Sequence, residues 1–167
     1  MENQKNFLPI AFQYGIILAV LRILVDFGLK MADVSAMVYY VGYIIGFILE
    51  IVLIFMAVKF FRDKINEGLL SFSEAIKIGI IMMVITGIGT FLSFSFIDAD
   101  FQMRKAIEFA EKYDPENVDT VIEQIEVGKE NPKYFLSFGM FIMYYIFIGF
   151  VISAIAGAVF GKKDEQY

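Results

Sequence analysis

The chain of 167 residues contains no cysteine, no histidine and no tryptophan, and it has only three prolines. Without cysteine and histidine it can form no Cys/His zinc site, no thiol nucleophile, no histidine-based triad and no haem ligated by either residue. The absence of thiols also means that the redox compartment cannot be inferred from cysteine usage. No other nucleophile–base pair is evident, so the sequence predicts no cofactor, no metal and no enzymatic activity.

Positive charge is also scarce. Lysine and arginine number 14 against 19 acidic residues, which gives a net charge of −5. Proteins that bind nucleic acid normally carry a basic surface. We therefore expect no nucleic-acid partner.

Apolar residues, by contrast, are abundant. They make up 59% of the chain, and the mean hydropathy is +0.68. A soluble domain typically holds about 45–50% apolar residues, and a small one has too much surface for its volume to bury more. The composition therefore predicts a single membrane domain, residues 1–167, with the lipid bilayer as its main partner.

Four apolar stretches are long enough to cross a bilayer as helices, because about 20 helical residues span its hydrocarbon core. A ten-residue alternating pattern typical of a membrane β-barrel is absent. Arg22 and Asp26 interrupt the first stretch, so we expect a retained helix there and not a cleaved signal peptide. The predicted fold class is an all-α polytopic membrane protein with four transmembrane helices, at about residues 8–29, 37–58, 72–97 and 134–160.

Local signals mark several helix ends. Ser71 and Glu74 form a capping box before the third span. Asn131-Pro132 is typical of the start of a helix and precedes the fourth span. Gly161 and the following Lys162-Lys163 are typical of its end.

The distribution of lysine and arginine predicts the orientation, because basic residues favour the cytoplasmic side. The connection after the second span carries Lys59, Arg62 and Lys64, and the chain ends hold Lys5, Lys162 and Lys163. We therefore expect both termini to be cytoplasmic and residues 30–36 and 99–133 to face outward.

The outer segment, residues 99–133, has nine acidic and five basic residues. Apolar residues recur at helical spacing on both sides of Asp114-Pro115, which predicts a helical hairpin. Its first helix continues the third span, and Gly128 stops its second. The hairpin is either a solvated connector or a partner-docking surface. The acidic residues lack the spacing of a calcium loop, so we assign no metal.

Three charged residues lie inside predicted spans: Arg22, Asp26 and Glu50. Such residues are costly in lipid and are candidate functional groups. Arg22 can pair with Asp26 one turn away, leaving Glu50 to bond a Tyr or Ser, or it can reach Glu50 across an antiparallel helix pair. The sequence leaves both pairings open, and it leaves open whether the charges are structural or line a substrate or proton pathway.

Small residues at four-residue spacing predict close helix contacts. Gly42 and Gly46 precede Glu50 in the second span, and the fourth carries Gly149, Ser153 and Gly157. The fourth-span stripe fits a contact within the chain and a homo-oligomer contact equally well. Tyr144 and Tyr145 lie at the centre of that span, where a phenol needs a hydrogen-bond partner, and they complete a candidate polar site with Arg22, Asp26 and Glu50.

Two stretches carry a family resemblance. Residues 61–64 (FRDK) and 67–79 (EGLLSFSEAIKIG) resemble the "YRDK…GGYISFGEAFKxG" signature of the domain-of-unknown-function 4199 family. Residues 97–101 (IDADF) are similar to its "YIDPDF", with Ala99 in place of proline. Glu67 and Ser73 depart from the usual glycines. The resemblance implies a small bacterial four-helix membrane protein with a long charged segment before the fourth helix, and it implies no reaction.

Together these features favour a small integral protein of a bacterial cytoplasmic membrane. Its expected role is structural or accessory, as a partner-binding subunit. The alternative is a small transporter or channel that uses Arg22, Asp26 and Glu50. A polar cavity around Glu50 would favour transport, whereas a dry, tightly packed bundle would favour the accessory role.

Overall fold

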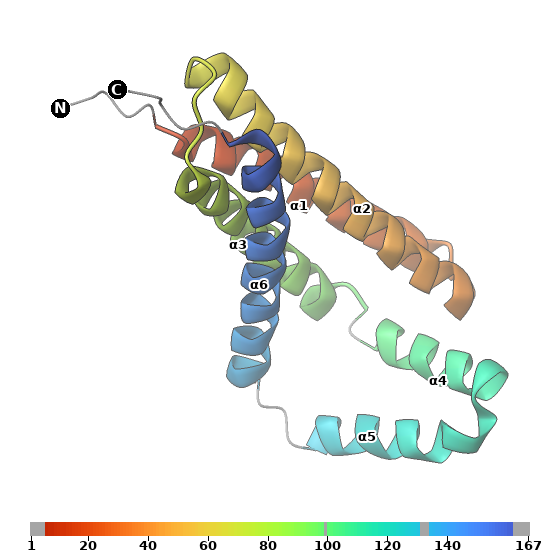
Figure 1. Ribbon diagram of the computed structural model, residues 1–167. Coiled ribbons are helices and arrows are strands. Elements are labelled where there is room, and N and C mark those ends of the chain that lie inside the picture. Colours follow the sequence, from red (N-terminus) through yellow and green to blue (C-terminus); the bar gives the residue numbers. More distant parts are fainter. Residues whose placement is uncertain (1–5, 99, 131–133, 162–167) are drawn as a thin grey trace.

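The computed structural model describes residues 6–98, 100–130 and 134–161, and these contain helices and no strand (Figure 1). Four helices are long and apolar enough to cross a bilayer, as in a multi-pass membrane protein. The predicted Asn131-Pro132 start signal and the lysine pair after Gly161 lie outside the described residues. The four long helices agree with the predicted spans to within two residues: α1 (Leu8–Met31), α2 (Ala36–Phe60), α3 (Phe72–Phe96) and α6 (Tyr134–Phe160).

The connection between α2 and α3 consists of a π-helical turn followed by a capping box. A π-helical turn, η1 (Phe61–Ile65), continues α2 and buries Phe61. The predicted capping box then starts α3: the Glu74 amide donates to Ser71 Oγ at 3.2 Å, and the Ser71 amide donates to Glu74 Oε2 at 2.8 Å. Glu74 therefore has a local structural role.

Helix α3 packs between α1 and α6. The small residues of α6 face those of α3: a Cβ on Gly79 would overlap Ser153 and lie 2.9 Å from the Gly149 carbonyl oxygen, and one on Gly157 would lie 3.0 Å from the Ala75 Cβ. The predicted helix contact is confirmed, and it is made within the chain. Close backbone approach of this kind is how helices associate in lipid, where apolar burial gives little driving force.

Helices α2 and α6 meet only over part of their length. Near η1 the Phe55 and Phe160 ring centroids are 5.7 Å apart, and Arg62 Nη1 donates to the Phe160 carbonyl at 3.3 Å. Away from this end α6 diverges from α2 (Figure 1). One side of the bundle is therefore tightly packed, and the side between α2 and α6 is open.

The segment between α3 and α6 differs from the prediction at two points. Helix α3 ends at Phe96 and does not continue, because Asp98 adopts a positive φ of 50° and Lys30 Nζ donates to the Ile97 carbonyl at 2.8 Å. A separate helix, α4 (Phe101–Tyr113), follows, and the predicted break at Asp114-Pro115 is confirmed by a 3₁₀ turn, η2 (Pro115–Asn117). Helix α5 (Val118–Glu130) passes through Gly128, so the predicted stop there is wrong: a glycine with an ordinary helical φ does not end a helix.

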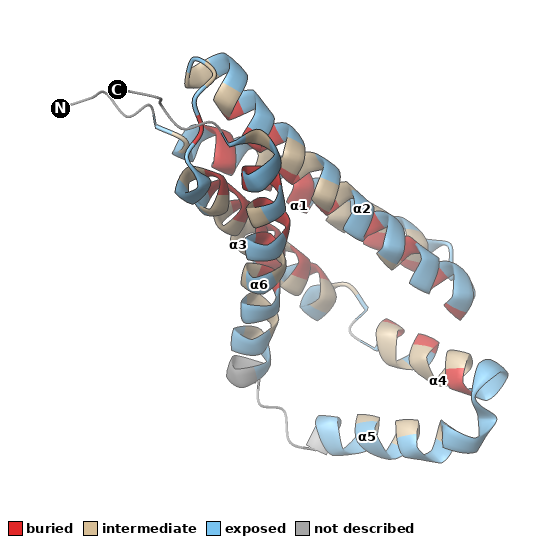
Figure 2. Ribbon diagram, in the orientation of Figure 1, coloured by how far each residue is buried: buried red, intermediate tan, exposed pale blue. Residues whose placement is uncertain are grey.

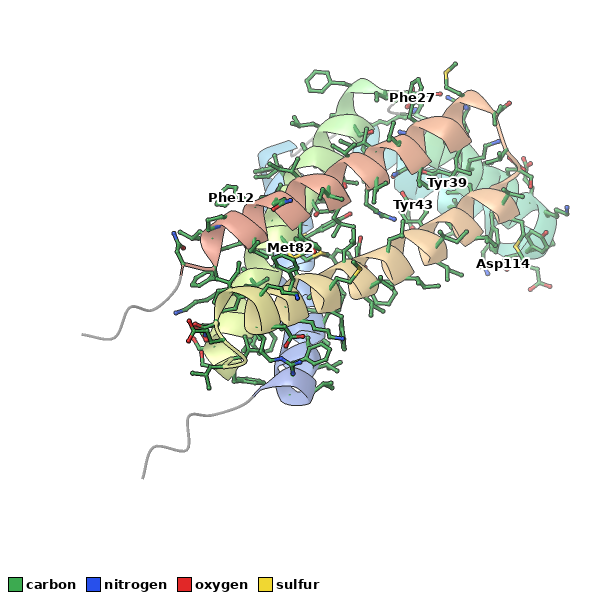
Figure 3. All side chains as sticks on the ribbon, turned by 90° about the horizontal axis from the view of Figure 1, so that it is seen from above. Phe12, Phe27, Tyr39, Tyr43, Met82 and Asp114 are labelled. Carbon is green, nitrogen blue, oxygen red and sulfur yellow. The ribbon has the colours of Figure 1, made fainter. Side chains whose placement is uncertain are left out.

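The outer surface of the four long helices is apolar. Phe12 and Phe27 point away from the bundle on α1, and both are exposed (Figure 3). Buried residues lie mainly on the faces that the long helices turn toward one another and on one side of α4 (Figure 2). Phe61 of η1 and Leu70, just before α3, are buried as well. A surface of exposed apolar side chains is suited to contact with lipid and not with water.

Candidate intramembrane site

Arg22 of α1 pairs with Glu50 of α2. The Arg22 Nε and Glu50 Oε1 atoms are 3.4 Å apart, and the two side chains are only 10% and 6% exposed. The contact is loose, because the buried Nε–H group makes no hydrogen bond. Of the two pairings that the sequence left open, Arg22 with Asp26 is wrong and Arg22 with Glu50 is correct.

The α2 backbone makes room for this pair. The Arg22 guanidinium lies directly against Gly46, where any Cβ would overlap it, and its Cζ is 5.6 Å from the centroid of the Tyr43 ring. At a rise of about 1.5 Å per residue, Glu50 lies about 21 Å along α2 from Ala36, deep within the span. The predicted packing role of Gly46 is thus to admit the arginine, whereas Gly42 admits Leu29.

Asp26 belongs to a second pair. Its Oδ2 atom lies 2.8 Å from Lys30 Nζ, one helical turn further along α1. Ser93 Oγ donates to Oδ2 at 3.4 Å and the Tyr39 hydroxyl donates to Oδ1 at 3.3 Å, so both carboxylate oxygens have partners. The Asp26–Lys30 pair therefore has hydrogen-bond partners for both carboxylate oxygens, whereas the Arg22–Glu50 pair leaves the Arg22 Nε–H group without one.

Hydroxyl groups extend the network to α4. The Tyr39 and Tyr43 hydroxyls are 3.2 Å apart, and Gln102 Nε2 of α4 donates to the Tyr43 hydroxyl at 2.7 Å. Both tyrosines lie between α1 and α2 (Figure 3). The polar chain thus runs from the second ion pair to the first helix of the outer segment.

The two predicted tyrosines of α6 differ. Tyr145 is 4% exposed and packs over Gly87 of α3, whose Cβ would lie 3.0 Å from the ring. Tyr144 is 59% exposed. Adjacent residues of a helix point about 100° apart, so the central position buries one phenol and not both.

A cavity of about 420 Å³ lies between α2 and α6. Its wall includes Arg22 and Glu50, and both Tyr144 and Tyr145 line it. We call it the α2–α6 cavity. Six of its ten lining residues carry polar or charged groups, which is unusual for the interior of a membrane span: Arg22, Tyr43, Glu50, Gln102, Tyr144 and Tyr145. The structure thus brings four of the five predicted site residues together and places Asp26 outside the cavity wall.

A family model described as "Protein of unknown function (DUF4199)" matches residues 10–162 of this sequence. The chain belongs to this family. The match covers α1 from its third residue, the other three long helices and both helices between α3 and α6. Comparison with curated proteins and with solved structures found no match. Family membership therefore supports the resemblance seen in the signature stretches and assigns no activity.

In this DUF4199 protein a second cavity, of about 440 Å³, lies between α2, α4 and α5. Tyr39, Tyr40 and Tyr43 line it, so we call it the tyrosine cavity. Tyr43 and Gln102 line both cavities, and they are joined by the 2.7 Å hydrogen bond. This bond therefore lies at the boundary between the tyrosine cavity and the α2–α6 cavity.

Charged side chains of helix α4 bind it to the start of α2 and to the residues just before it. Glu108 Oε1 accepts from the Ala36 amide at 2.8 Å, where Ser35 makes no side-chain cap. Lys105 Nζ lies 2.9 Å from Glu108 Oε2 and 3.1 Å from Asp33 Oδ1. The Ala36 amide, and then Lys105, lower the pKa of Glu108, and the bond to Glu108 raises the pKa of Lys105. A carboxylate at a helix N-terminus is stabilising because it satisfies a free amide and faces the positive end of the helix dipole.

Sequence reasoning missed five residues of the polar network around the two ion pairs: Lys30, Tyr39, Tyr43, Ser93 and Gln102. Lys30 had a signal, since it follows Asp26 at the i, i+4 spacing of an ion pair. The tyrosines lie one helical turn apart, which placed them on one face but did not show which face was buried. Gln102 had no signal, because its role depends on where α4 docks.

Among the described residues, no group of three or more acidic side chains is arranged to hold a metal ion. Both cavities have volumes in the range of about 300–1,000 Å³ that is usual for ligand pockets. The α2–α6 cavity is the better suited to a small molecule, because its wall also holds the charged groups of Arg22 and Glu50.

Proposed function

We propose that this DUF4199 protein is a small membrane transporter that binds its solute in the α2–α6 cavity. The observation that carries the proposal is the loose Arg22–Glu50 pair in the wall of this cavity, within the membrane-spanning part of the molecule. A purely structural ion pair at this depth gains stability only when its geometry is tight and its remaining polar atoms are bonded. The Asp26–Lys30 pair meets that condition and the Arg22–Glu50 pair does not.

The arrangement of the helices also supports transport. The α1–α3–α6 contacts form a tightly packed side, whereas α2 and α6 are joined near η1 and diverge from there. The Tyr43–Gln102 bond lies where the tyrosine cavity borders the α2–α6 cavity. Such a cavity, closed at one end and covered by a hydrogen bond at the other, fits one conformation of an alternating-access cycle.

For the setting of this activity we keep the orientation inferred from the lysines and arginines. Both termini and η1 face the cytoplasm of a bacterial cell, and α4 and α5 lie on the outer surface of its cytoplasmic membrane. The absence of enzymatic activity and of a nucleic-acid partner stays a prediction.

The test uses single cysteines in this cysteine-free chain, reconstituted in liposomes. Tyr144→Cys lies in the cavity wall, and Phe12→Cys lies on the outward face of α1 as its control. A charged, membrane-impermeant thiosulfonate needs water around its target. A transporter predicts that the Tyr144→Cys thiol reacts with reagent added to either side, because the cavity opens to each in turn. The Phe12→Cys thiol should react with neither. A Tyr144→Cys thiol that is unreactive, or that reacts from a single side only, contradicts transport.

A second candidate function is the accessory one, and α5 favours it. This helix contacts mainly α4 and η2, and its exposed face carries Asp119, Glu123 and Glu126. An acidic helix with so few contacts to the rest of the molecule is suited to dock a basic surface of a partner protein. The accessory role predicts that a partner co-purifies in mild detergent and is lost when these three acids become Asn or Gln, with no change in the reactivity of the Tyr144→Cys thiol.

A further inference from the structure

The charges of the α2–α6 cavity specify the kind of ligand it can accept. Its wall holds one cation, Arg22, and one anion, Glu50, so the site is neutral as a whole. A ligand with a single negative charge would be attracted by Arg22 and repelled by Glu50, and a single positive charge would meet the reverse. Repulsion by the like charge of the site is strong in either case where water is scarce, because charges interact more strongly at low dielectric.

Both partners have unused bonding capacity. The Arg22 Nε–H group is buried and makes no hydrogen bond. Glu50 contacts Arg22 through Oε1, and the described contacts include no hydrogen bond to its Oε2. A ligand that brings an acceptor to Arg22 and a donor to Glu50 would satisfy both groups at once, as charge-assisted hydrogen bonds do.

The rest of the wall is aromatic. Phe47, Phe94 and Phe141 line it beside Tyr144 and Tyr145. Rings of this kind accept an apolar side chain or an acyl chain. The cavity therefore combines a dipolar end with an apolar surface.

We infer that the α2–α6 cavity binds a zwitterion, whose ammonium group pairs with Glu50, whose carboxylate or phosphate pairs with Arg22, and whose apolar part lies on the aromatic wall. Gly46 positions the guanidinium for this contact, because any larger residue there would displace it. Two sources supply this chemistry: a free amphipathic amino acid and the headgroup of phosphatidylethanolamine. The inference rests on the proposed function and defines its substrate class.

The first arm tests the free zwitterion. The full chain in detergent is titrated by calorimetry with L-phenylalanine, with 3-phenylpropionate, which lacks the ammonium, and with 2-phenylethylamine, which lacks the carboxylate. We expect phenylalanine to bind at least about tenfold tighter than either analogue, or about 1.4 kcal/mol. The second arm incubates delipidated protein with phosphatidylethanolamine or with phosphatidylglycerol and measures retained lipid by native mass spectrometry. Retention of phosphatidylethanolamine alone, with no phenylalanine binding, identifies the lipid as the source.

Two variants and their controls tie binding to the cavity. Glu50→Gln should weaken binding of the preferred zwitterion at least about tenfold, and Glu126→Gln on the exposed face of α5 should not. Phe47→Ala, which removes part of the wall without touching the charges, should also weaken binding, whereas Phe12→Ala should not. Phe47→Ala keeps the test decisive if Glu50→Gln fails to fold.

The outcomes separate the two claims. Equal binding of phenylalanine and its single-charge analogues overturns the inference, as does failure to bind both phenylalanine and phosphatidylethanolamine. If the Tyr144→Cys thiol still reacts from both sides in that case, transport stands and only the substrate class is wrong. If that thiol is unreactive from either side but the zwitterion binds, the binding site stands and transport is wrong.

Discussion

Arg22 Nε and Glu50 Oε1 lie 3.4 Å apart, although one turn along α1 from Arg22 there is an oppositely charged Asp26. Asp26 instead contacts Lys30 at 2.8 Å, together with Ser93 and Tyr39. Glu50 therefore pairs with Arg22, and Asp26 pairs with Lys30. The first pair lines the α2–α6 cavity, and in the second pair hydroxyl groups also donate hydrogen bonds to the carboxylate.

The first prediction concerns this division. Arg22→Leu leaves Glu50 buried without a counter-charge and should lower the free energy of unfolding by about 3–5 kcal/mol. The double change Arg22→Leu with Glu50→Leu should recover most of that loss, because replacing both charges of a buried pair with apolar groups is often neutral or stabilising. Reversible unfolding in mixed detergent, followed by circular dichroism, measures both. A double variant no more stable than the single one would show that the pair is not an isolated unit.

The second prediction concerns the α3–α6 contact. Gly79→Ala should destabilise by about 1–3 kcal/mol, because its Cβ would meet the Gly149 carbonyl oxygen, which belongs to a backbone that cannot rotate away. Gly28→Ala is the matched control, since nothing lies within 4 Å of its Cβ and helical alanine is favoured over glycine by about 0.5–1 kcal/mol. The same unfolding measurement applies.

Gly157→Leu should act in the same way as Gly79→Ala and more strongly. Because Gly157 packs on Ala75 and Phe72 of the same chain, the variant should yield misfolded or degraded protein and not folded monomers. Size-exclusion chromatography separates the two results, and folded Gly157→Leu protein of unchanged thermal stability would refute the contact.

The third prediction concerns orientation. Asn66 follows η1, and Asn117 lies in η2. The connection from α2 to α3 and the connection from α4 to α5, which contain these residues, lie at opposite ends of the molecule (Figure 1). Each asparagine is replaced by a single cysteine. In intact cells an impermeant thiol reagent should label Asn117→Cys and not Asn66→Cys. Labelling of Asn66→Cys alone would reverse the orientation, and would place α4 and α5 in the cytoplasm.

The fourth prediction concerns pH and the docking of α4. The pKa of Glu108 is lowered by the Ala36 amide and by Lys105, so its carboxylate stabilises docking above its unfolded pKa of about 4.5. That stabilisation is lost as the pH falls through the lowered pKa of the folded state. Asp98 behaves alike, because its bonds to Arg104 lower its pKa. Lys105 acts in the opposite range: its pKa is raised, so its contribution is lost only as the pH rises above about 10.5.

Hydrogen exchange of α4 amides measures this docking. Protection should be constant near neutrality and fall in strong acid, and Glu108→Gln should lower it at pH 7 and reduce its pH dependence. Glu111→Gln is the control, since Glu111 is exposed on the same helix. Equal protection in Glu108→Gln and the unaltered chain would mean that aromatic contacts such as Phe101 with Tyr39 hold α4 by themselves.

The fifth prediction concerns access to the α2–α6 cavity. Gln102→Ala removes the hydrogen bond that joins α4 to Tyr43 at the border of both cavities. Combined with Tyr144→Cys, it should speed the reaction of the thiol with reagent added outside and leave the rate from inside unchanged. Gln124→Ala on α5 is the control, because Gln124 is exposed. No change in either rate would show that this bond does not limit access.

The sequence alone predicts the four spans, their bounds to within two residues, the capping box at Ser71 and a helix contact through the small residues of α6. These features depend on composition and on spacing along one helix, and the bilayer imposes both because it accepts only long apolar helices with satisfied backbones. It also determined that Arg22, Asp26 and Glu50 needed partners, since a lone charge in lipid is costly.

Which partners these charged residues have depends on the tertiary structure. Pairing of Arg22 with Glu50 depends on the rotation of α1 against α2, which Gly46 permits, and composition does not set that rotation. The end of α3 at Phe96 depends on Lys30 reaching the Ile97 carbonyl from another helix. The α2–α6 cavity exists because α6 packs along α3 and diverges from α2. This arrangement results from packing between helices, so the sequence of any one helix does not predict it.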